Sequence, residues 1–500
     1  MKSENKKNYI IADFGASSGR ISVASYDENS FEIETVHRFE NSQILLNGRY
    51  YWDILRLFSE LKKGIFISFQ KFKNIRSVAV DTWGIDFGFI DKAGKLMSNP
   101  LAYRDPLKSE RDPKNFFKTI TETDLYNLTG YYTIPMAPAF FLEKLASEND
   151  YELLNAHKIL PLSDLLNYFL TGNFAIEYSM ACGMLLVNCK TKTWDDGIIK
   201  EAGISKDILS EIIDSGELVG KALNEIVNVP GIKPFSVITA AGHDTASAVA
   251  GIPSVSANYD FAFLATGTWL VIAAETKKPV LNFDSTRHFF MNEGGPLRRN
   301  FFARNLTGFW IIQKCVERWE KEEGRQIPWK EIDDLFIKEK PFRSLINTED
   351  PFFSQNSDNM PELIKSYCQR NNIAVPESKG QIARCIYESL VMSVRFYFEL
   401  LKKYCNKEYK KVHIIGGGVN NNNFCQWLSN VLEVEIIAGP VEAATVGNLL
   451  MQLKADKEIN SITEGRKLSL NSFKTKVYEP EDVQIWDEKY REFVGFFNFQ

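Results

Sequence analysis

A run of small residues around one acid is the most informative stretch of the chain. The apolar segment 237–241 leads into Gly242-His243-Asp244-Thr245, and Ala, Ser and Ala follow at once. This pattern predicts a strand that ends near Gly242 and a helix that begins directly after it. Asp244 would then lie at the carboxyl end of a strand, where open α/β sheets bind their ligands. An Asp at this point can also serve simply as the cap of the helix, and the pattern leaves both roles open.

Two hairpins that carry glycine and hydroxyl residues suggest a place for phosphates. The first has Gly15-Ala16-Ser17-Ser18-Gly19-Arg20 between two apolar runs, with Asp13 just before it. Such a turn exposes the N–H groups and hydroxyls that a phosphate chain requires, although many hairpins of this composition bind nothing. Asp13 would repel phosphates unless Mg²⁺, held through water, lay between them.

The second hairpin repeats the first near the middle of the chain. Strand-like runs flank Thr266-Gly267-Thr268 within 259–273. One such hairpin opening each half predicts a duplicated fold in which the two hairpins hold one polyphosphate from both sides.

Further candidate residues lie near predicted turns and helix starts. Asp81, Trp83, Gly84 and Asp86 surround a turn that suits a sugar, and a core Trp explains them equally well. A helix over 306–322 is expected, with Asn305 as its cap and Gln313 two turns further on the same face. Glycines 416–418 end a strand before a helix, a place that suits a phosphate or a base, and the helix that 439–448 opens is expected to pack under them.

Composition narrows the class of protein. The 500 residues suggest two domains, and a net charge of −5 argues against nucleic acid as the main partner. The polar first eight residues predict no secretory signal, and no apolar run approaches membrane-spanning length, so we expect a cytoplasmic protein without a membrane partner. Seven cysteines without a C-x-x-C pair indicate buried thiols; Cys368 and Cys385 are the most plausible pair if any two are bridged.

Several blocks in this order resemble the FGGY-type carbohydrate kinases. They cover most of the chain from about Tyr9 to Leu453 and comprise 13–20, 81–86, 103–105, 242–249, 267–269, 292–295, 416–418 and 439–443. The resemblance implies an α/β fold with two actin-like (ribonuclease-H-like) domains and an interdomain cleft. It also implies transfer of the γ-phosphoryl group of ATP to the C1 hydroxyl of L-rhamnulose, with ATP and Mg²⁺ as cofactors.

The same resemblance implies roles for single residues. Asp244 would be the proton acceptor, and the substrate would meet Gly84, His243, Asp244, Thr245 and Asn305. ATP would be bound by Ala16, Ser17, Ser18, Gly19, Arg20, Thr268, Gln313 and Gly417, with Asp13 placing Mg²⁺ through water. We expect the sugar-binding domain over 1–252, the nucleotide-binding domain over 253–456 and a surface tail over 457–500.

Alternatives remain at this point. A kinase for L-fuculose or another ketose shares every motif, because sugar choice depends on a few hydroxyl contacts. An actin-like, nucleotide-switched binding protein would share the fold and the hairpins. The expected assembly is a monomer or a small homo-oligomer.

Overall fold

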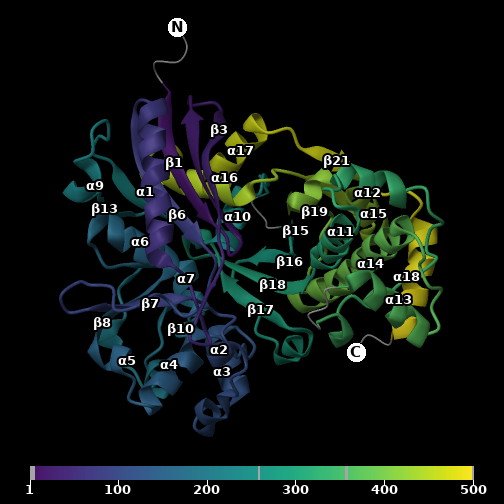
Figure 1. Ribbon diagram of the computed structural model, residues 1–500, viewed down its shortest axis with the longest axis horizontal. Coiled ribbons are helices and arrows are strands. Elements are labelled where there is room, and N and C mark those ends of the chain that lie inside the picture. The colour runs from purple at the N-terminus through teal and green to yellow at the C-terminus, as the bar shows by residue number, and fades with distance from the viewer. Residues whose placement is uncertain (1–5, 257–259, 355–358, 498–500) are drawn as a thin grey trace. The chain divides into compact units, whose positions relative to one another are not determined.

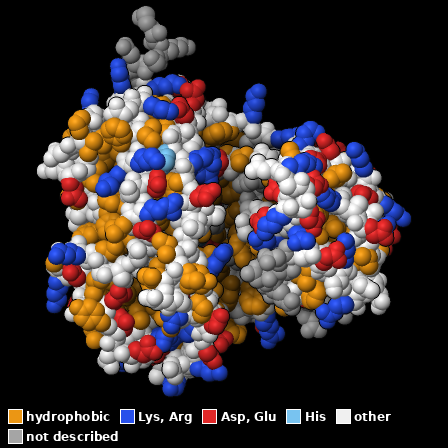
Figure 2. All heavy atoms as spheres, in the orientation of Figure 1, with side chains coloured by type: hydrophobic (Ala, Val, Ile, Leu, Met, Phe, Trp, Pro, Cys, Tyr) orange, Lys and Arg blue, Asp and Glu red, His pale blue; other side chains and the backbone are white. Residues whose placement is uncertain are grey.

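The computed structural model describes residues 6–256, 260–354 and 359–497. The chain divides into two compact units (Figure 1). The first contains residues 1–257, 275–302 and 442–474, and the second contains 258–274, 303–441 and 475–500. Lys and Arg side chains are interspersed with Asp and Glu over the face shown in Figure 2.

The first unit is built on a six-stranded sheet with strand order β13-β14-β6-β1-β2-β3. β6 runs parallel to both β1 and β14, and the other pairs are antiparallel. The bounds are β1 Lys7–Phe14, β2 Ser18–Tyr26, β3 Phe31–Glu40, β6 Ile75–Thr82, β13 Leu218–Lys221 and β14 Ser236–His243.

Both faces of the central strands β1, β6 and β14 are buried, and successive residues of a strand alternate between two apolar layers. On β1, Ile10, Ala12 and Phe14 face the core formed with α1 (Ile54–Lys71) and α6 (Leu162–Thr171). Tyr9 and Ile11 face the opposite layer. That layer holds α10 (Asp244–Gly251), α16 (Ala443–Ala455) and α17 (Ile462–Ser472), and Figure 1 shows the yellow α16 and α17 beside the purple strands.

A long segment between β6 and β14 adds further elements to the first unit. They are β7 (Phe87–Asp91), α2 (Pro106–Ser109), α3 (Glu122–Thr129), α4 (Pro138–Ser147), α5 (Tyr151–Asn155), β8 (Ala156–Pro161), β9 (Ile176–Glu177), α7 (Tyr178–Gly183), β10 (Val187–Asn188), β11 (Thr193–Trp194), α8 (Asp196–Glu201) and β12 (Ile212–Ile213). The hairpin β4 (Ile44–Leu46) and β5 (Arg49–Tyr51), the helix α9 (Asn224–Val227) and the strand β17 (Phe290–Gly294) also belong to this unit.

The second unit repeats the central arrangement of the first. Its strands lie in the order β18-β16-β15-β19-β20-β21, with β15 antiparallel to β16 and parallel to β19. The strands are β15 Phe261–Thr266, β16 Trp269–Thr276, β18 Asn300–Thr307, β19 Lys411–Gly416, β20 Glu435–Ala438 and β21 Lys476–Tyr478. The helices are α11 Trp310–Glu323, α12 Trp329–Phe336, α13 Met360–Arg370, α14 Lys379–Cys405, α15 Asn422–Leu432 and α18 Val483–Phe497. An α/β fold of two related units was expected and is confirmed.

The structure divides the chain differently from the consecutive domains expected over 1–252 and 253–456. Residues 442–474 fold with the first unit, and residues 257–259, shortly after the expected boundary at 252/253, lie outside the described residues. The segment 457–500 is not a surface tail, because α17 buries Ile462 and Leu468 and α18 buries Trp486. The apolar side chains of α17 and α18 recur at helical spacing, but many charged residues lie between them. The segment is therefore polar on average, and its composition alone suggested an exposed tail.

Two local predictions were wrong. Asn305 lies on β18 and caps no helix, since α11 begins at Trp310 with Phe309 at its N-cap. The segment between Gly203 and Gly220, whose sequence predicts a helical excursion, contains only a short 3₁₀ turn and two short strands. In both places turn-forming residues beside an apolar run fit a strand end as well as a helix start.

All seven cysteines are free thiols, and six of them are buried, as expected for a chain without C-x-x-C pairs. Cys368 and Cys385 are not bridged. Among the described residues, no helix combines the length and apolar character needed to cross a bilayer.

Candidate active site

Asp244 is the first residue of α10, directly after β14 ends at His243. Its side chain is 35% exposed, and its Oδ1 accepts hydrogen bonds from the Thr245 N–H at 2.6 Å and the Thr245 hydroxyl at 3.2 Å. Its Oδ2 accepts no hydrogen bond from any residue that the structure describes. The N-cap of α10 is His243, so Asp244 does not cap the helix; Thr245 engages one of its carboxylate oxygens, and the other is available to a substrate.

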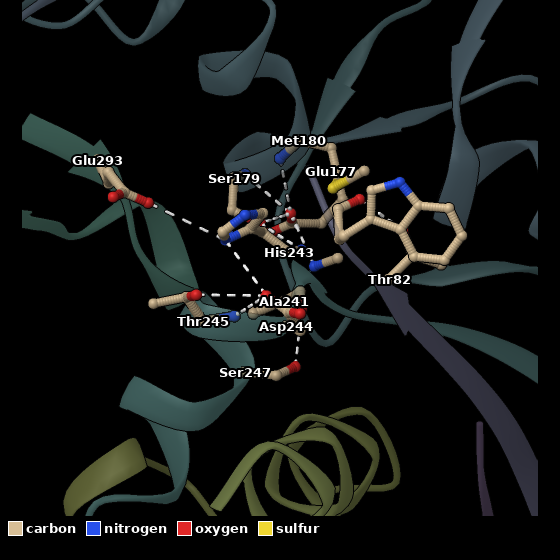
Figure 3. A network of polar contacts seen from close by, with 12 residues as sticks. Thr82, Glu177, Ser179, Met180, Ala241, His243, Asp244, Thr245, Ser247 and Glu293 are labelled. Carbon is tan, nitrogen blue, oxygen red and sulfur yellow. Dashed lines mark hydrogen bonds and ion pairs between the residues drawn. The ribbon is translucent and has the colours of Figure 1, made fainter. Parts of the chain in front are cut away.

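A buried acid fixes the end of β14. The Glu177 Oε2 accepts hydrogen bonds from the N–H groups of Gly242 at 3.0 Å and Ser179 at 2.8 Å, and from the Ser179 hydroxyl. The Ser179 Oγ in turn accepts the N–H of His243 at 3.1 Å (Figure 3). Burial raises the pKa of Glu177 to about 7. Sequence reasoning missed this residue, whose signal was a single acid between the apolar Ile176 and Tyr178.

The residues of the first unit that are predicted to bind the sugar lie together around the His243 ring. A Cβ atom built on Gly84 would lie 2.6 Å from His243 Cδ2 and 2.8 Å from His243 Nε2, so only glycine allows this approach. On its other side, His243 Nδ1 lies 3.9 Å from Asp244 Oδ1 and 4.0 Å from Glu293 Oε2. Gly84, His243, Asp244 and Thr245 thus form one cluster, which we call the His243 cluster. Asn305 is on β18 in the second unit.

The turn that carries Gly84 is held by the buried carboxylate of Asp86. Asp86 is 1% exposed and accepts hydrogen bonds from Trp52 Nε1 at 2.7 Å, Trp83 Nε1 at 3.0 Å and Lys108 Nζ at 3.0 Å. Trp83 and Asp86 are therefore core residues that shape the turn. Of the two interpretations of this motif, a sugar site or a structural core, this favours the structural core for these two residues. Ile85 has a φ of 64°, a rare conformation for a β-branched residue, and such strain is often found at functional sites.

The first glycine hairpin joins β1 to β2 as expected, with the Gly15 N–H donating to the Ser18 carbonyl at 2.8 Å. Ala16 is half-buried, the side chains of Ser17 and Ser18 are exposed, and their hydroxyls have no partner in the described part of the chain. Gly19 lies against the Phe39 ring, where a Cβ atom would collide. The exposed hydroxyls and N–H groups of this turn suit an anionic ligand.

Two carboxylates lie side by side behind this hairpin. Asp13 pairs with Asp81 across the parallel strands β1 and β6, and the Arg20 Nε lies 3.4 Å from Asp13 Oδ2. Burial raises the pKa of Asp13, and the charge of Arg20 opposes this. Burial also raises the pKa of Asp81 well above its ordinary value, and the charge of Asp13 adds to the effect.

Helix α16 supplies partners to both acids from the other end of the chain. The Thr445 hydroxyl donates to Asp13 Oδ2 at 3.1 Å, and Asn448 Nδ2 donates to Asp81 Oδ2 at 2.6 Å. We expected this helix to pack under glycines 416–418, but it packs in the first unit, where a Cβ on Gly447 would collide with the Ser247 carbonyl of α10. The signal that was missed is a polar face at 445, 448 and 452 within an otherwise apolar helix.

These acids fit a water-mediated Mg²⁺ better than a closed metal cage. The buried Asp81 Oδ1 has no hydrogen-bond partner among the residues that the structure describes, so it could accept a bond from a metal-bound water. No group of three or more His, Cys, Asp or Glu residues in the described part of the chain could enclose a metal ion. Mg²⁺ commonly keeps several waters and uses one or two carboxylates, which matches a site of two acids.

The residues of the second unit that we expect to bind ATP lie around the hairpin of β15 and β16. The Thr268 hydroxyl approaches Gln313 Oε1 at 3.5 Å, and the carbonyls of Gly267 and Thr268 accept the N–H groups of Phe309 and Trp310 at the start of α11. Thr266 Oγ1 accepts the Gly418 N–H at 2.8 Å. These contacts bring Thr268 and Gln313 together and tie the hairpin to the glycine segment 416–418.

Gly417 adds an open stretch of backbone to this group. A Cβ on Gly417 would meet nothing within 4 Å, whereas Gly416 has a φ of 85° and a Cβ there would collide with the Thr266 carbonyl. The turn therefore requires Gly416 for its conformation and leaves the backbone at Gly417 accessible to a ligand.

Comparison with known proteins gives the family. The profile of the N-terminal domain of the FGGY family of carbohydrate kinases matches residues 8–251, and that of the C-terminal domain matches residues 262–455. A rhamnulokinase of Bacteroides thetaiotaomicron is 34% identical over 98% of this chain and 99% of its own length. A rhamnulokinase of Enterococcus faecalis is 32% identical over 97% of each chain.

Solved structures agree on the fold. A gluconate kinase from Lactobacillus acidophilus superimposes with a TM-score of 0.78 at 16% identity, covering 99% of this chain and 98% of its own. A glycerol kinase from Plasmodium falciparum, solved with ADP, gives a TM-score of 0.75 at 18% identity, covering 98% and 97%. With profiles matching both halves, the chain belongs to the FGGY family of carbohydrate kinases.

Proposed function

We propose that this kinase transfers the γ-phosphoryl group of ATP to the C1 hydroxyl of L-rhamnulose, giving L-rhamnulose 1-phosphate and ADP. The observation that carries the chemistry is Asp244, whose Oδ2 accepts no hydrogen bond from the described residues, within contact distance of His243. The choice of ketose is supported by relatives named rhamnulokinase at about one-third identity over nearly the full chain. ATP and the sugar phosphate product are both metabolites of the cytoplasm, where we place the protein.

In this reaction, Asp244 accepts the proton of the C1 hydroxyl as its oxygen attacks the γ-phosphorus. The bond from the γ-phosphorus to the oxygen that bridges it to the β-phosphorus breaks, and ADP leaves with that electron pair. Alignment and neutralisation of charge supply most of the rate in phosphoryl transfer, so a positioned carboxylate is sufficient as the base. His243 and Gly84 position the ketose, because the adjacent acid already fills the role of base.

ATP is assigned to residues of both hairpins. In the first unit these are Ala16 to Arg20, and in the second unit they are Thr268, Gln313 and Gly417. That both groups hold one ATP stays a prediction, as does the contribution of Asn305 to sugar binding. Asp13, with Asp81 beside it, would hold Mg²⁺ through water, and the ion would neutralise phosphate charge when bound.

An ADP-release assay with a panel of ketoses tests the proposal. We expect L-rhamnulose to give the highest kcat/KM, with L-fuculose and other ketoses below it. If ATP is hydrolysed at the same rate without any sugar, the protein is an actin-like nucleotide switch and the proposal is wrong. If another ketose is preferred, the reaction stands and the assigned substrate changes.

The Thr268→Ala variant tests the assignment of the second hairpin. Because Thr268 is exposed beside Gln313, its loss should raise the KM for ATP and leave the KM for the ketose near that of the wild type. An unchanged KM for ATP would remove this hairpin from the nucleotide site. Thr191→Ala, which removes an exposed hydroxyl after β10, is the matched control.

A further inference from the structure

Glu293 is a buried acid of the first unit whose carboxylate has no hydrogen bond within the described residues. It lies on β17, is 8% exposed, and has His243 as its one ion-pair contact in the described part of the chain, at 4.0 Å from Nδ1 to Oε2. Burial raises its pKa, and the charge of His243 opposes that rise. Withdrawing a carboxylate from water without donors is costly, so this acid requires an explanation beyond the contacts that the described residues supply.

The backbone on either side of Glu293 is held rigidly. The neighbouring Asn292 donates its backbone N–H to the Gly130 carbonyl at 2.8 Å and accepts the Val280 N–H at 2.6 Å through its side chain. On the other side, a Cβ on Gly294 would lie 2.8 Å from Cys182 Sγ of α7. β17 therefore has little freedom to move Glu293 toward another partner in the protein.

The same helix α7 positions the ring that Glu293 faces. The Ser179 hydroxyl of α7 accepts the backbone N–H of His243 at 3.1 Å. Gly84 packs against the edge of the imidazole that carries Cδ2 and Nε2. Figure 3 shows Glu293 reaching from β17 toward His243, while Asp244 and Thr245 lie on the side of α10. Three groups able to bind hydroxyls thus converge on one point: the His243 Nδ1, the Asp244 carboxylate and the Glu293 carboxylate.

The separation of 4.0 Å is too long for a hydrogen bond between Glu293 and His243. It does fit one bridging hydroxyl, because an oxygen about 2.8 Å from each atom, an ordinary hydrogen-bond length, spans this gap. A metal ion is not suggested by the geometry, since no metal-binding group of three or more candidate ligands occurs in the described ranges. A polyhydroxylated sugar supplies such an oxygen.

We infer that Glu293 is a substrate-binding residue that accepts a hydrogen bond from a ketose hydroxyl, one that also contacts His243 and is distinct from the C1 hydroxyl that attacks phosphorus. This inference depends on the proposed ketose kinase activity and adds a determinant of sugar choice to it. A site built to pair a substrate hydroxyl strongly rejects an analogue that lacks it, because its buried polar groups are left unpaired.

The test compares Glu293→Gln and Glu293→Ala with the wild type in steady-state kinetics. Hydrogen bonds to charged groups are among the stronger ones, so we expect the KM for the ketose to rise about 10- to 100-fold and the KM for ATP to change less than about twofold. Glu225→Gln on α9, an exposed acid of the same unit, is the control and should leave both values unchanged. Equal rises in both KM values would indicate a structural role and overturn the inference, as would an unchanged KM for the ketose.

A series of monodeoxy ketoses gives a second, independent readout. One deoxy position should lower kcat/KM for the wild type and have little further effect in Glu293→Ala, because the partner of that hydroxyl is already gone. If the variants do not fold, the wild-type series decides: no loss at any position other than C1 would overturn the inference. A wild type inactive on all ketoses would instead refute the proposed function, so the two failures are distinguishable.

Discussion

Asp244 illustrates how a short motif acquires a chemical role from its surroundings. One of its oxygens is engaged by Thr245 at the start of α10, and the other has no partner among the described residues. Its position depends on Glu177, which binds the backbone of Gly242 and, through Ser179, that of His243. The carboxylate is therefore both positioned and available.

The Asp244→Asn variant should lose roughly 10²–10⁴ in kcat, because a general base contributes about that factor and an amide cannot accept the proton. ATP binding should survive, since none of the residues assigned to ATP is changed. Both quantities can be measured by ADP release and by calorimetric titration with ATP. Asp196→Asn, an exposed acid of the same unit, is the control, and near-wild-type activity of Asp244→Asn would show that Asp244 has only a structural role at the start of α10.

Glu177 should make the stability of the protein depend on pH. Its pKa is raised from an ordinary 4.5 to about 7, so between these values the unfolded chain releases a proton that the folded protein retains. Stability therefore falls as pH rises through this window, by up to about 3 kcal/mol at 1.36 kcal/mol per pKa unit.

Urea unfolding of Glu177→Gln at pH 5, 6, 7 and 8 tests this expectation. The amide retains an acceptor oxygen but cannot ionise, so the variant should lose less stability than the wild type between pH 5 and 7. If the free energy of unfolding depended on pH in the same way for both proteins, the raised pKa of Glu177 would be contradicted. Glu225→Gln should reproduce the wild-type profile, because Glu225 is exposed.

At the scale of elements, the contact between α10 and α16 determines where Asp244 lies. Gly447 of α16 approaches the Ser247 carbonyl of α10, and Gly251 of α10 approaches Ala443 of α16, so closely that neither glycine has room for a side chain. α16 also contacts Asp13 and Asp81 through Thr445 and Asn448. One helix thus supports the candidate base and both candidate metal-binding acids.

Gly447→Ala should destabilise the protein by about 1–3 kcal/mol, because overpacking forces the two helices apart. Since α10 carries Asp244, kcat should fall as well. The matched control is Gly495→Ala on α18, where a Cβ meets nothing within 4 Å and alanine should be neutral or stabilising by about 0.5–1 kcal/mol. Thermal unfolding of Gly447→Ala at the wild-type temperature would show that the helices can accommodate a methyl group.

At the scale of the whole molecule, the segment 442–474, far along the chain, completes the first unit. Arg466 of α17 is 2% exposed, pairs with the buried Glu275 at 2.8 Å, and donates to the Val249 carbonyl of α10 at 2.7 Å. Residues 442–474 therefore return to a sheet that begins at Lys7.

Truncation after residue 456 should destabilise the protein severely, because it removes α17, β21 and α18 and leaves Glu275 as a buried charge whose one remaining ion-pair partner among the described residues is Arg299, 3.7 Å away. Arg466→Met in the full chain removes the ion pair with Glu275 and keeps α17. It should lower the free energy of unfolding by about 3–5 kcal/mol, the usual cost of breaking a buried ion pair. Chemical unfolding measures both variants. Arg491→Met on α18, with a side chain 79% exposed, should be nearly neutral, and an equally small effect for Arg466→Met would contradict the argument.

The sequence alone was enough for the α/β class, the two glycine hairpins and the strand before Asp244, because each depends on a local periodicity or on the residues of one turn. It also grouped Gly84, His243, Asp244 and Thr245 through family resemblance. Only the tertiary structure placed Asn305 on a strand, gave Trp83 and Asp86 to the core, and revealed Glu177, Glu293 and the polar face of α16. The physical reason is that these contacts join segments distant along the chain, such as Thr445 and Asp13, and local periodicity carries no information about which distant partner a side chain will meet.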